Sequence, residues 1–258
     1  MSAPHRIGLE ICVDSAAGLR AAVENGADRI ELCAALSEGG LTPSKGMMDI
    51  ASGLSIPVRA MIRPRAGNFT YDGTELDVMR RDIEEVAASA LEGVVLGCND
   101  ESGNLDETLL ASLAGHARAL GLQITLHRSF DLVRDPLHAL NVAAALGIDT
   151  ILTSGQQPTA MAGLELIAQL VQAARNANIQ IMAGGGVMPF AVEPLIARAG
   201  VRFVHASCRR PHDDSHQSSG AARLLNMTLH RETDPMLIAQ LRRALDALEN
   251  MNCVGAGT

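Results

Sequence analysis

Short apolar runs alternate along the chain with longer stretches whose apolar positions follow a helical period. The runs are rich in β-branched residues, and eight follow one another, at 6–13, 28–34, 57–64, 93–98, 123–128, 150–154, 179–183 and 202–207. Strands that alternate with helices are typical of a parallel α/β fold. We therefore predict a single (β/α)8 TIM barrel over residues 1–258. An open doubly wound sheet is disfavoured, because eight strands are near its upper size.

Helix boundaries have their own signals. Three helices are predicted to begin where a capping side chain precedes proline, at Thr42-Pro43, Asp135-Pro136 and Asp234-Pro235. Four are predicted to end at glycine, at Gly26, Gly121, Gly147 and Gly200. The last helix is expected over 235–250. A polar excursion at about 209–233 precedes it, and we expect it to be solvated, with a cover over the barrel mouth as the alternative.

Polar and apolar side chains alternate within the strands. In the first two strands Glu10, Cys12, Glu31 and Cys33 share one phase, and the apolar residues share the other. Helices should cover the apolar phase, so the polar phase should point into the barrel. The same alternation adds Arg63, His127, His205 and Ser207 to the inward set.

Charged groups inside the barrel need partners. An unpaired buried carboxylate costs several kcal/mol, so Glu10, Glu31, Arg63 and His127 must pair with one another or with a ligand. One interpretation is a structural network of ion pairs. The other is a polar pocket, which is favoured because these residues lie toward the carboxyl ends of the strands, where barrel sites form.

Further polar residues and glycines follow the strands at the same end. The candidate ligand-binding residues are Glu10, Arg63, Arg65, Arg128, Asp131, Ser154, Gly184, Gly185, Gly186, His205 and Ser207. A glycine-rich turn that leads into a helix can hold phosphate, and the arginines favour anions. This pattern predicts an anion-binding mouth, with Glu31 or His127 as candidate catalytic acid or base.

Two cysteines form a second candidate site. Cys12 and Cys33 end the similar segments LEIC and IELC, which predicts corresponding positions on adjacent strands, roughly 4.8 Å apart. Two thiolates suit a soft ion such as Cu(I). The alternative is that both are small buried core residues. The chain has five scattered cysteines, which argues against a disulfide framework.

Composition narrows the range of partners. The chain has 29 acidic and 21 basic residues, a formal net charge of −8, and only 2% aromatic residues. Both properties argue against nucleic-acid binding, which uses basic surfaces and stacking rings. The amino terminus does not have the pattern of a signal peptide, and no apolar stretch approaches the roughly 20 residues of a membrane span. We expect a cytoplasmic protein with no membrane partner.

Seven segments resemble, in order, those of the CutC family of copper homeostasis proteins. They are LEICVDS, GADRIELC, GGLTPS, MIRPR, LHRSFD, ILTSG and MAGGGV. The resemblance implies a cytoplasmic barrel that forms dimers or tetramers, with copper as its partner. It places the Cu(I)-ligating cysteines at Cys12 and Cys33. It places the polar mouth at Glu10, Glu31, Arg63, Arg65, His127, Arg128 and Asp131.

The chain departs from the family pattern in two places. The usual TFHRAFD reads TLHRSFD here, with Leu126 and Ser129, and the region after Cys208 follows no pattern that we can align. We therefore expect a cytoplasmic, homo-oligomeric, Cu(I)-binding barrel. The alternative is a barrel enzyme that acts on a small anionic or phosphorylated metabolite.

Overall fold

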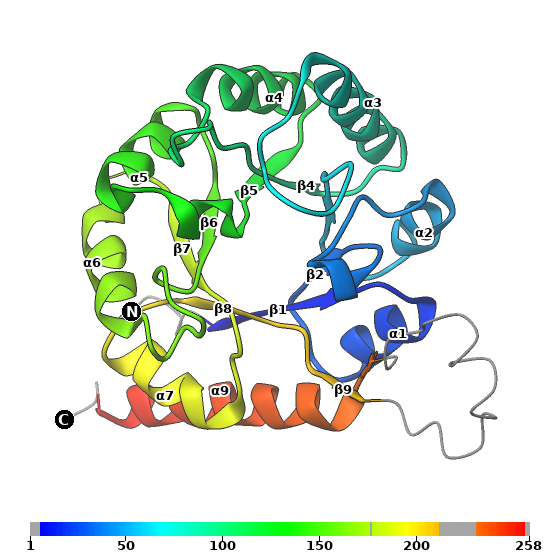
Figure 1. Ribbon diagram of the computed structural model, residues 1–258. Coiled ribbons are helices and arrows are strands. Elements are labelled where there is room, and N and C mark those ends of the chain that lie inside the picture. The colour runs from blue at the N-terminus through cyan, green and yellow to red at the C-terminus, as the bar shows by residue number, and fades with distance from the viewer. Residues whose placement is uncertain (1–5, 176, 212–230, 256–258) are drawn as a thin grey trace.

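The computed structural model describes residues 6–175, 177–211 and 231–255. Eight parallel strands close into a barrel in chain order, so that the last strand lies beside the first (Figure 1). They are β1 Gly8–Val13, β2 Arg29–Leu32, β3 Val58–Met61, β4 Gly93–Leu96, β5 Gln123–Leu126, β6 Thr150–Thr153, β7 Gln180–Ala183 and β8 Phe203–Ala206. The predicted (β/α)8 barrel is confirmed, and each strand lies within its predicted run.

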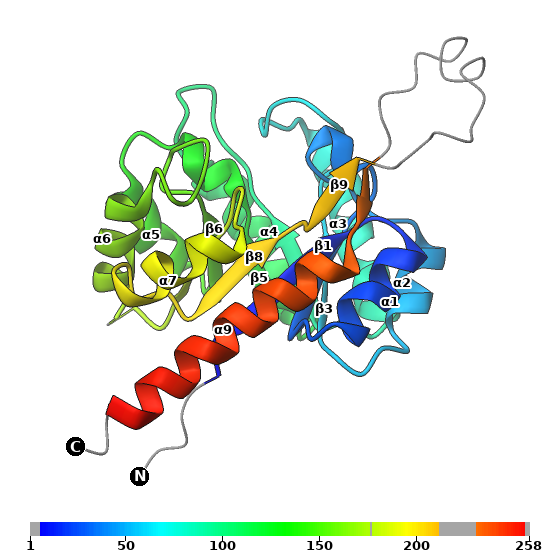
Figure 2. The same cartoon turned by 90° about the horizontal axis from the view of Figure 1, so that it is seen from below.

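Helices surround the barrel (Figure 1). They are α1 Ala16–Glu24, α2 Lys45–Ala51, α3 Gly73–Ala88, α4 Glu107–Ala119, α5 Pro136–Ala145, α6 Leu164–Ala174, α7 Pro189–Ala197 and α9 Pro235–Gly255, with short 3-10 helices η1 Leu36–Glu38 and η2 Arg128–Leu132. The last helix, α9, packs against both α1 and α7 and extends beyond its predicted end (Figure 2). In the part of the chain that the structure describes, none of the helices has the length and apolar character of a membrane span.

The helix boundaries agree with the sequence signals at most positions. Asp135 accepts hydrogen bonds from the first amides of α5, and Asp234 accepts one from the amide of Met236 in α9. The predicted start at Thr42 is wrong, because α2 begins at Lys45 and is capped by Ser44. The glycines predicted to end helices all have positive φ; they are Gly26, Gly121, Gly147 and Gly200.

The two phases of the strands separate as predicted. Leu9 and Ile11 of β1 are fully buried in the layer between strands and helices, within the main apolar core. Glu10 and Glu31 are also buried, at 0% and 3% exposure. The hydrogen-bond partners of Glu10 are Arg29 of β2 and His205 of β8, both inside the barrel. The barrel therefore encloses a polar interior inside an aliphatic shell.

A short antiparallel ribbon projects from the barrel after β8 (Figure 2). It consists of β9 Arg209–Pro211 and β10 Arg231–Thr233, the two ends of the predicted polar excursion. The remainder of that excursion lies outside the described residues, so its expected solvated character stays a prediction.

Candidate functional site

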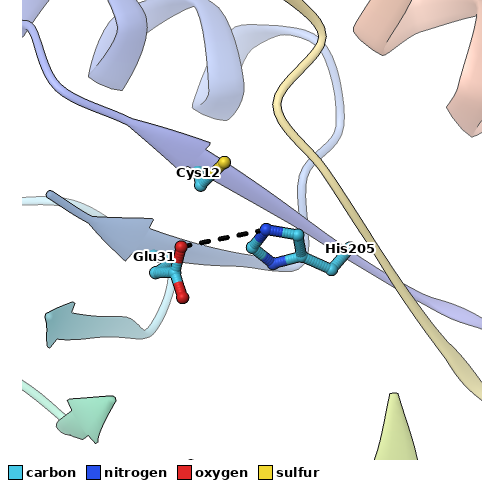
Figure 3. A group of neighbouring side chains, drawn as sticks. All are labelled: Cys12, Glu31 and His205. Atoms are coloured by element: carbon cyan, nitrogen blue, oxygen red, sulfur yellow. Dashed lines mark ion pairs between the residues drawn. The ribbon is translucent and has the colours of Figure 1, made fainter. Parts of the chain in front are cut away.

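Three side chains of potential metal ligands converge inside the barrel (Figure 3). Ligand atoms of Cys12, Glu31 and His205 all lie within 4.8 Å of one another, and all three residues are buried. They come from β1, β2 and β8, which are adjacent because the barrel closes between β8 and β1. The register places Cys12 beside Glu31 and Glu10 beside His205, all in the inward phase.

The ring of His205 is fixed by a chain of charged groups. Its Nδ1 lies 2.8 Å from Glu10 Oε1 and donates to it, because a carboxylate only accepts. The other oxygen of Glu10 accepts a 2.5 Å hydrogen bond from Arg29 Nε. His205 Nε2 then faces the cluster, 3.8 Å from Glu31 Oε2. A carboxylate that orients the imidazole and leaves its second nitrogen free is the usual outer partner of a metal-binding histidine.

These contacts set the protonation states of the network. Burial would raise the pKa of Glu10, but the charge of Arg29 and the contact with His205 lower it to about 2. Burial lowers the pKa of His205, but Cys12, Glu31 and the hydrogen bond to Glu10 together raise it well above its usual value. Burial raises the pKa of both Cys12 and Glu31. A metal at this cluster would therefore displace protons from its ligands.

Cys33 lies two residues further toward the mouth than the sequence repeat predicts. The expectation that it sits directly beside Cys12 is wrong, because the register of β1 and β2 pairs Cys12 with Glu31. Cys33 Sγ contacts Glu31 Oε2 at 3.6 Å, and the residue packs in a small apolar cluster with Met61. Burial and then the charge of Glu31 raise the pKa of Cys33 well above its usual value. Its role as a copper ligand stays a prediction.

The cluster opens into a cavity of about 490 Å³ at the carboxyl ends of the strands. Predicted site residues that line it are Cys12, Glu31, Arg63, His127, Arg128, His205 and Ser207. Other lining residues are Leu36, Ser37, Gly39, Met61, Phe69, Leu152, Arg209 and Arg231. Predicted residues outside this lining are Glu10, Cys33, Arg65, Asp131, Ser154, Gly184, Gly185 and Gly186. The cavity thus collects about half of the predicted site.

His127 follows β5 and is 3% exposed. Its Nδ1 accepts the amide hydrogen of Ser129 at 3.1 Å, which caps η2, and its Nε2 has no partner among the described residues. Burial and the charge of Arg63 lower the pKa of His127 to about 3. The ring is therefore neutral near pH 7, with its proton on Nε2. Catalytic roles for His127 and Glu31 stay predictions.

Arg63 and Arg65 hold loops at the mouth. Arg63 donates to the backbone carbonyls of Glu38, Gly40 and Gly67 at 2.7, 3.0 and 2.9 Å. It therefore joins the β2–α2 and β3–α3 loops. Arg65 pairs with Glu75 at the start of α3 and with carbonyls of its own loop. Arg65 thus serves the loop, and a ligand-binding role for it stays a prediction.

Asp131 organises the mouth on the side of β5 and β6. It accepts hydrogen bonds from Arg128 Nε at 2.8 Å, from Thr153 Oγ1 at 2.5 Å and from the amide of Ser154. Arg128 Nη2 also donates to Ser154 Oγ at 2.7 Å. These bonds position the Arg128 guanidinium at the rim of the cavity, where its side chain is 43% exposed.

The three glycines after β7, Gly184 to Gly186, let the backbone pass close to Ser154 and Arg128. Gly185 has φ +100°, and a Cβ there would lie 3.1 Å from Ser154 Cβ and 3.5 Å from Arg128 Cζ. A Cβ on Gly184 would lie 2.4 Å from a methyl group of Leu152. The glycines therefore serve close packing, and phosphate binding by this turn stays a prediction.

Several residues of the site were missed from the sequence, among them Arg29 and Phe69. Arg29 shares the inward phase with Glu31, so strand alternation could have identified it as the partner of Glu10. Phe69 comes from the irregular β3–α3 loop, and no periodic signal marks its ring, which lies 4.7 Å from that of His127.

The family model and the similar proteins both indicate the same family. The sequence model of the CutC family matches residues 7–210. A CutC family protein of Sinorhizobium medicae is 47% identical over 95% of this chain and 98% of its own length. A CutC family protein of Caulobacter vibrioides is 45% identical over 95% of this chain and 99% of its own length.

Solved structures agree in fold. A CutC protein from Streptococcus agalactiae, described as a candidate copper homeostasis protein, superposes with a TM-score of 0.73 and 31% identity, over 78% of this chain and 98% of its own. Thiamine phosphate pyrophosphorylase from Pyrococcus furiosus, at 17% identity, superposes with a TM-score of 0.59 over 96% of this chain and 99% of its own. At that identity the second likeness shows the barrel fold alone.

Proposed function

Because the chain belongs to the CutC family, we propose that it is a copper homeostasis protein that binds Cu(I) through Cys12 and His205. The observation that supports this most is the convergence of Cys12, Glu31 and His205 within 4.8 Å at the base of a cavity. Copper is the cargo of such a site rather than a resident cofactor.

The donor set favours a soft ion. A thiolate and an imidazole suit Cu(I), whereas a carboxylate suits harder ions. His205 presents Nε2 because Glu10 holds Nδ1, and this outer contact fixes the ring before an ion arrives. Cys33 lies near the cluster through its contact with Glu31, and we propose it as a further ligand that joins after a side-chain rotation.

A competition titration tests this proposal. Under anaerobic, reducing conditions the metal-free protein should take one Cu(I) from a chromogenic Cu(I) chelator. Cys12→Ser and His205→Asn should each weaken binding by more than about 100-fold, since loss of even an outer partner costs roughly 10–100-fold. Asn at 205 keeps an amide that can contact Glu10 but removes Nε2, the atom proposed to bind Cu(I).

The matched control is Cys98→Ser, because Cys98 is as buried as Cys12 but packs in the main apolar core. It should bind Cu(I) like the unaltered protein. Unchanged Cu(I) affinity in Cys12→Ser, or tighter binding of Zn²⁺ than of Cu(I), would contradict the proposal. Cys33→Ser measures the proposed contribution of the second cysteine.

The proposal includes a cytoplasmic homo-oligomer of two or four chains, as the family resemblance implies. Light scattering coupled to size-exclusion chromatography measures the oligomeric state directly. A monomer at micromolar concentration would remove this part of the proposal and leave the metal site unaffected.

A further inference from the structure

We propose that the cavity also binds a small organic anion, held by Arg63 and His127 on the β3 and β5 side of the barrel. Arg63 and His127 follow β3 and β5, whereas Cys12, Glu31 and His205 come from β1, β2 and β8, and both groups line the same cavity. The inference goes beyond copper binding and does not depend on it.

The first argument is an uncompensated buried charge. Arg63 is 5% exposed, and the hydrogen-bond partners of its Nη atoms are three backbone carbonyls, which carry no formal charge. In the described parts of the chain no carboxylate pairs with its guanidinium, and its Nε has no partner. A buried cation without a counter-ion is costly, so an anion bound beside it would be strongly favoured.

The second argument is an unused hydrogen-bond donor, His127 Nε2, in a ring that contacts the same phenylalanine as Arg63. His127 Nε2 is buried and has no partner among the described residues, while Nδ1 is occupied by Ser129. The Arg63 guanidinium lies 5.0 Å from the centre of the Phe69 ring, and the His127 ring lies 4.7 Å from it. Arg63 and His127 therefore approach one aromatic side chain, and all three residues line the cavity.

The remaining wall defines the class of ligand. Leu36, Met61, Phe69 and Leu152 give the cavity an apolar surface, and its volume of about 490 Å³ is within the range of roughly 300–1,000 Å³ typical of small-molecule sites. Among the residues that the structure describes, the lining contains one carboxylate, Glu31, and four arginines, Arg63, Arg128, Arg209 and Arg231, of which Arg128 and Arg209 pair with Asp131 and Asp14. This excess of basic side chains attracts anions to the mouth of a chain whose net charge is −8. The ligand is thus a carboxylate or phosphate with a short apolar body.

Calorimetric titration of the metal-free protein tests the inference. The probes are butyrate, 2-hydroxybutyrate and butylphosphonate, with inorganic phosphate and butylammonium as comparisons. At least one of the three organic anions should bind at a single site and more tightly than inorganic phosphate, and butylammonium should not bind. The ratio of carboxylate to phosphonate affinity identifies the preferred head group.

Two variants test whether the anion binds at Arg63 and His127. His127→Asn and Arg63→Lys should each weaken binding of the preferred anion by about tenfold or more, because each removes a donor to a charged group. Asn at 127 can still accept the Ser129 amide, so this variant carries the test if Arg63→Lys fails to fold. Arg59→Lys is the control, because Arg59 is as buried as Arg63 but pairs with Glu92 and lies outside the cavity lining, and it should bind like the unaltered protein.

The results have distinct meanings. If none of the organic anions binds saturably, or if His127→Asn binds as tightly as the unaltered protein, the inference is overturned. Equal binding of butylammonium overturns it too, because the recognised feature would then be the apolar body alone. Copper is absent throughout, so failure here leaves the Cu(I) proposal standing, and failure of Cu(I) binding leaves this one standing.

Discussion

Glu10 connects the charges inside the barrel to the candidate metal site. Its side chain is fully buried and contacts both Arg29 and His205. Glu10→Gln keeps the shape but removes the charge, so Arg29 is left buried without a counter-ion. We expect a loss of about 3–5 kcal/mol in the free energy of unfolding. We also expect Cu(I) affinity to fall by roughly 10–100-fold, because His205 loses its orienting carboxylate. Urea unfolding and chelator competition measure the two effects.

Glu92→Gln is the matched comparison for this variant. Glu92 pairs with the buried Arg59, but its side chain is 33% exposed, so solvent can replace the lost charge. It should cost clearly less stability and leave Cu(I) affinity unchanged. If Glu10→Gln were no more harmful than Glu92→Gln, the network would not support His205 in the way described.

His127 gives the protein a specific dependence on pH. Burial and Arg63 lower its pKa from 6.5 to about 3, so between these values the unfolded chain binds a proton that the folded chain does not. Stability attributable to His127 is therefore full above about pH 6.5 and decreases as pH falls toward 3. From pH 7 to pH 5 this amounts to about 2 kcal/mol. In His127→Asn the same pH change should cost about that much less.

Urea unfolding at pH 5, 6 and 7 measures this difference. His138→Asn serves as control, because the side chain of His138 is 67% exposed. Parallel pH profiles for the unaltered protein and His127→Asn would show that His127 titrates normally and would contradict its buried, neutral state. Comparison between variants is needed because His205, whose pKa is raised, contributes the opposite slope.

At this scale, strand alternation predicted which side chains enter the barrel but not how they pair. Glu10, Glu31 and His127 all point inward as expected. The pairing of Glu10 with Arg29 and His205 depends on the stagger of neighbouring strands, which the alternation within one strand does not reveal. The loop contacts of Arg63 depend on carbonyl positions in irregular turns, which have no period to read.

At the scale of elements, close contact between the end of β4 and η2 positions His127. Gly97 follows β4, and a Cβ there would lie 2.3 Å from Ser129 Oγ and 2.7 Å from two ring atoms of His127. Gly97→Ala should therefore displace the His127 ring and cost about 1–3 kcal/mol through overpacking. Thermal unfolding measures the loss, and the histidine NMR signals report the displacement.

Gly115→Ala is the control for Gly97→Ala. Gly115 lies on the exposed side of α4, where an added Cβ has nothing within 4 Å. Alanine is the better helix former by roughly 0.5–1 kcal/mol, so this variant should be slightly more stable. If Gly97→Ala left thermal stability unchanged, η2 would be able to move away, and the position of His127 would not be fixed by the end of β4.

The register between β1 and β2 shows why element-level prediction stopped short of the site. The repeated segments around Cys12 and Cys33 share a pattern, and the pattern suggested that the cysteines lie side by side. Strands in a closed barrel are staggered, so Cys12 pairs with Glu31 instead. Repeat spacing gives the order of strands, whereas the stagger follows from the packing of the whole barrel.

At the scale of the whole molecule, closure of the barrel creates the candidate metal site. His205 is 195 residues from Glu10 along the chain, yet β8 lies directly beside β1. The sequence predicted the closed barrel and placed His205 in the mouth. It did not single out His205 as a partner of Cys12, since only the closed geometry makes them neighbours. The cavity, the candidate cluster and the β9–β10 ribbon all lie toward the carboxyl ends of the strands.

The most direct test of the central claim is the X-ray absorption spectrum of the protein loaded with one equivalent of Cu(I). We expect sulfur and imidazole nitrogen together in the first coordination shell. The nitrogen contribution should disappear in His205→Asn, and the sulfur contribution should decrease in Cys12→Ser. A shell of oxygen ligands alone, or a spectrum that neither variant changes, would contradict the central claim.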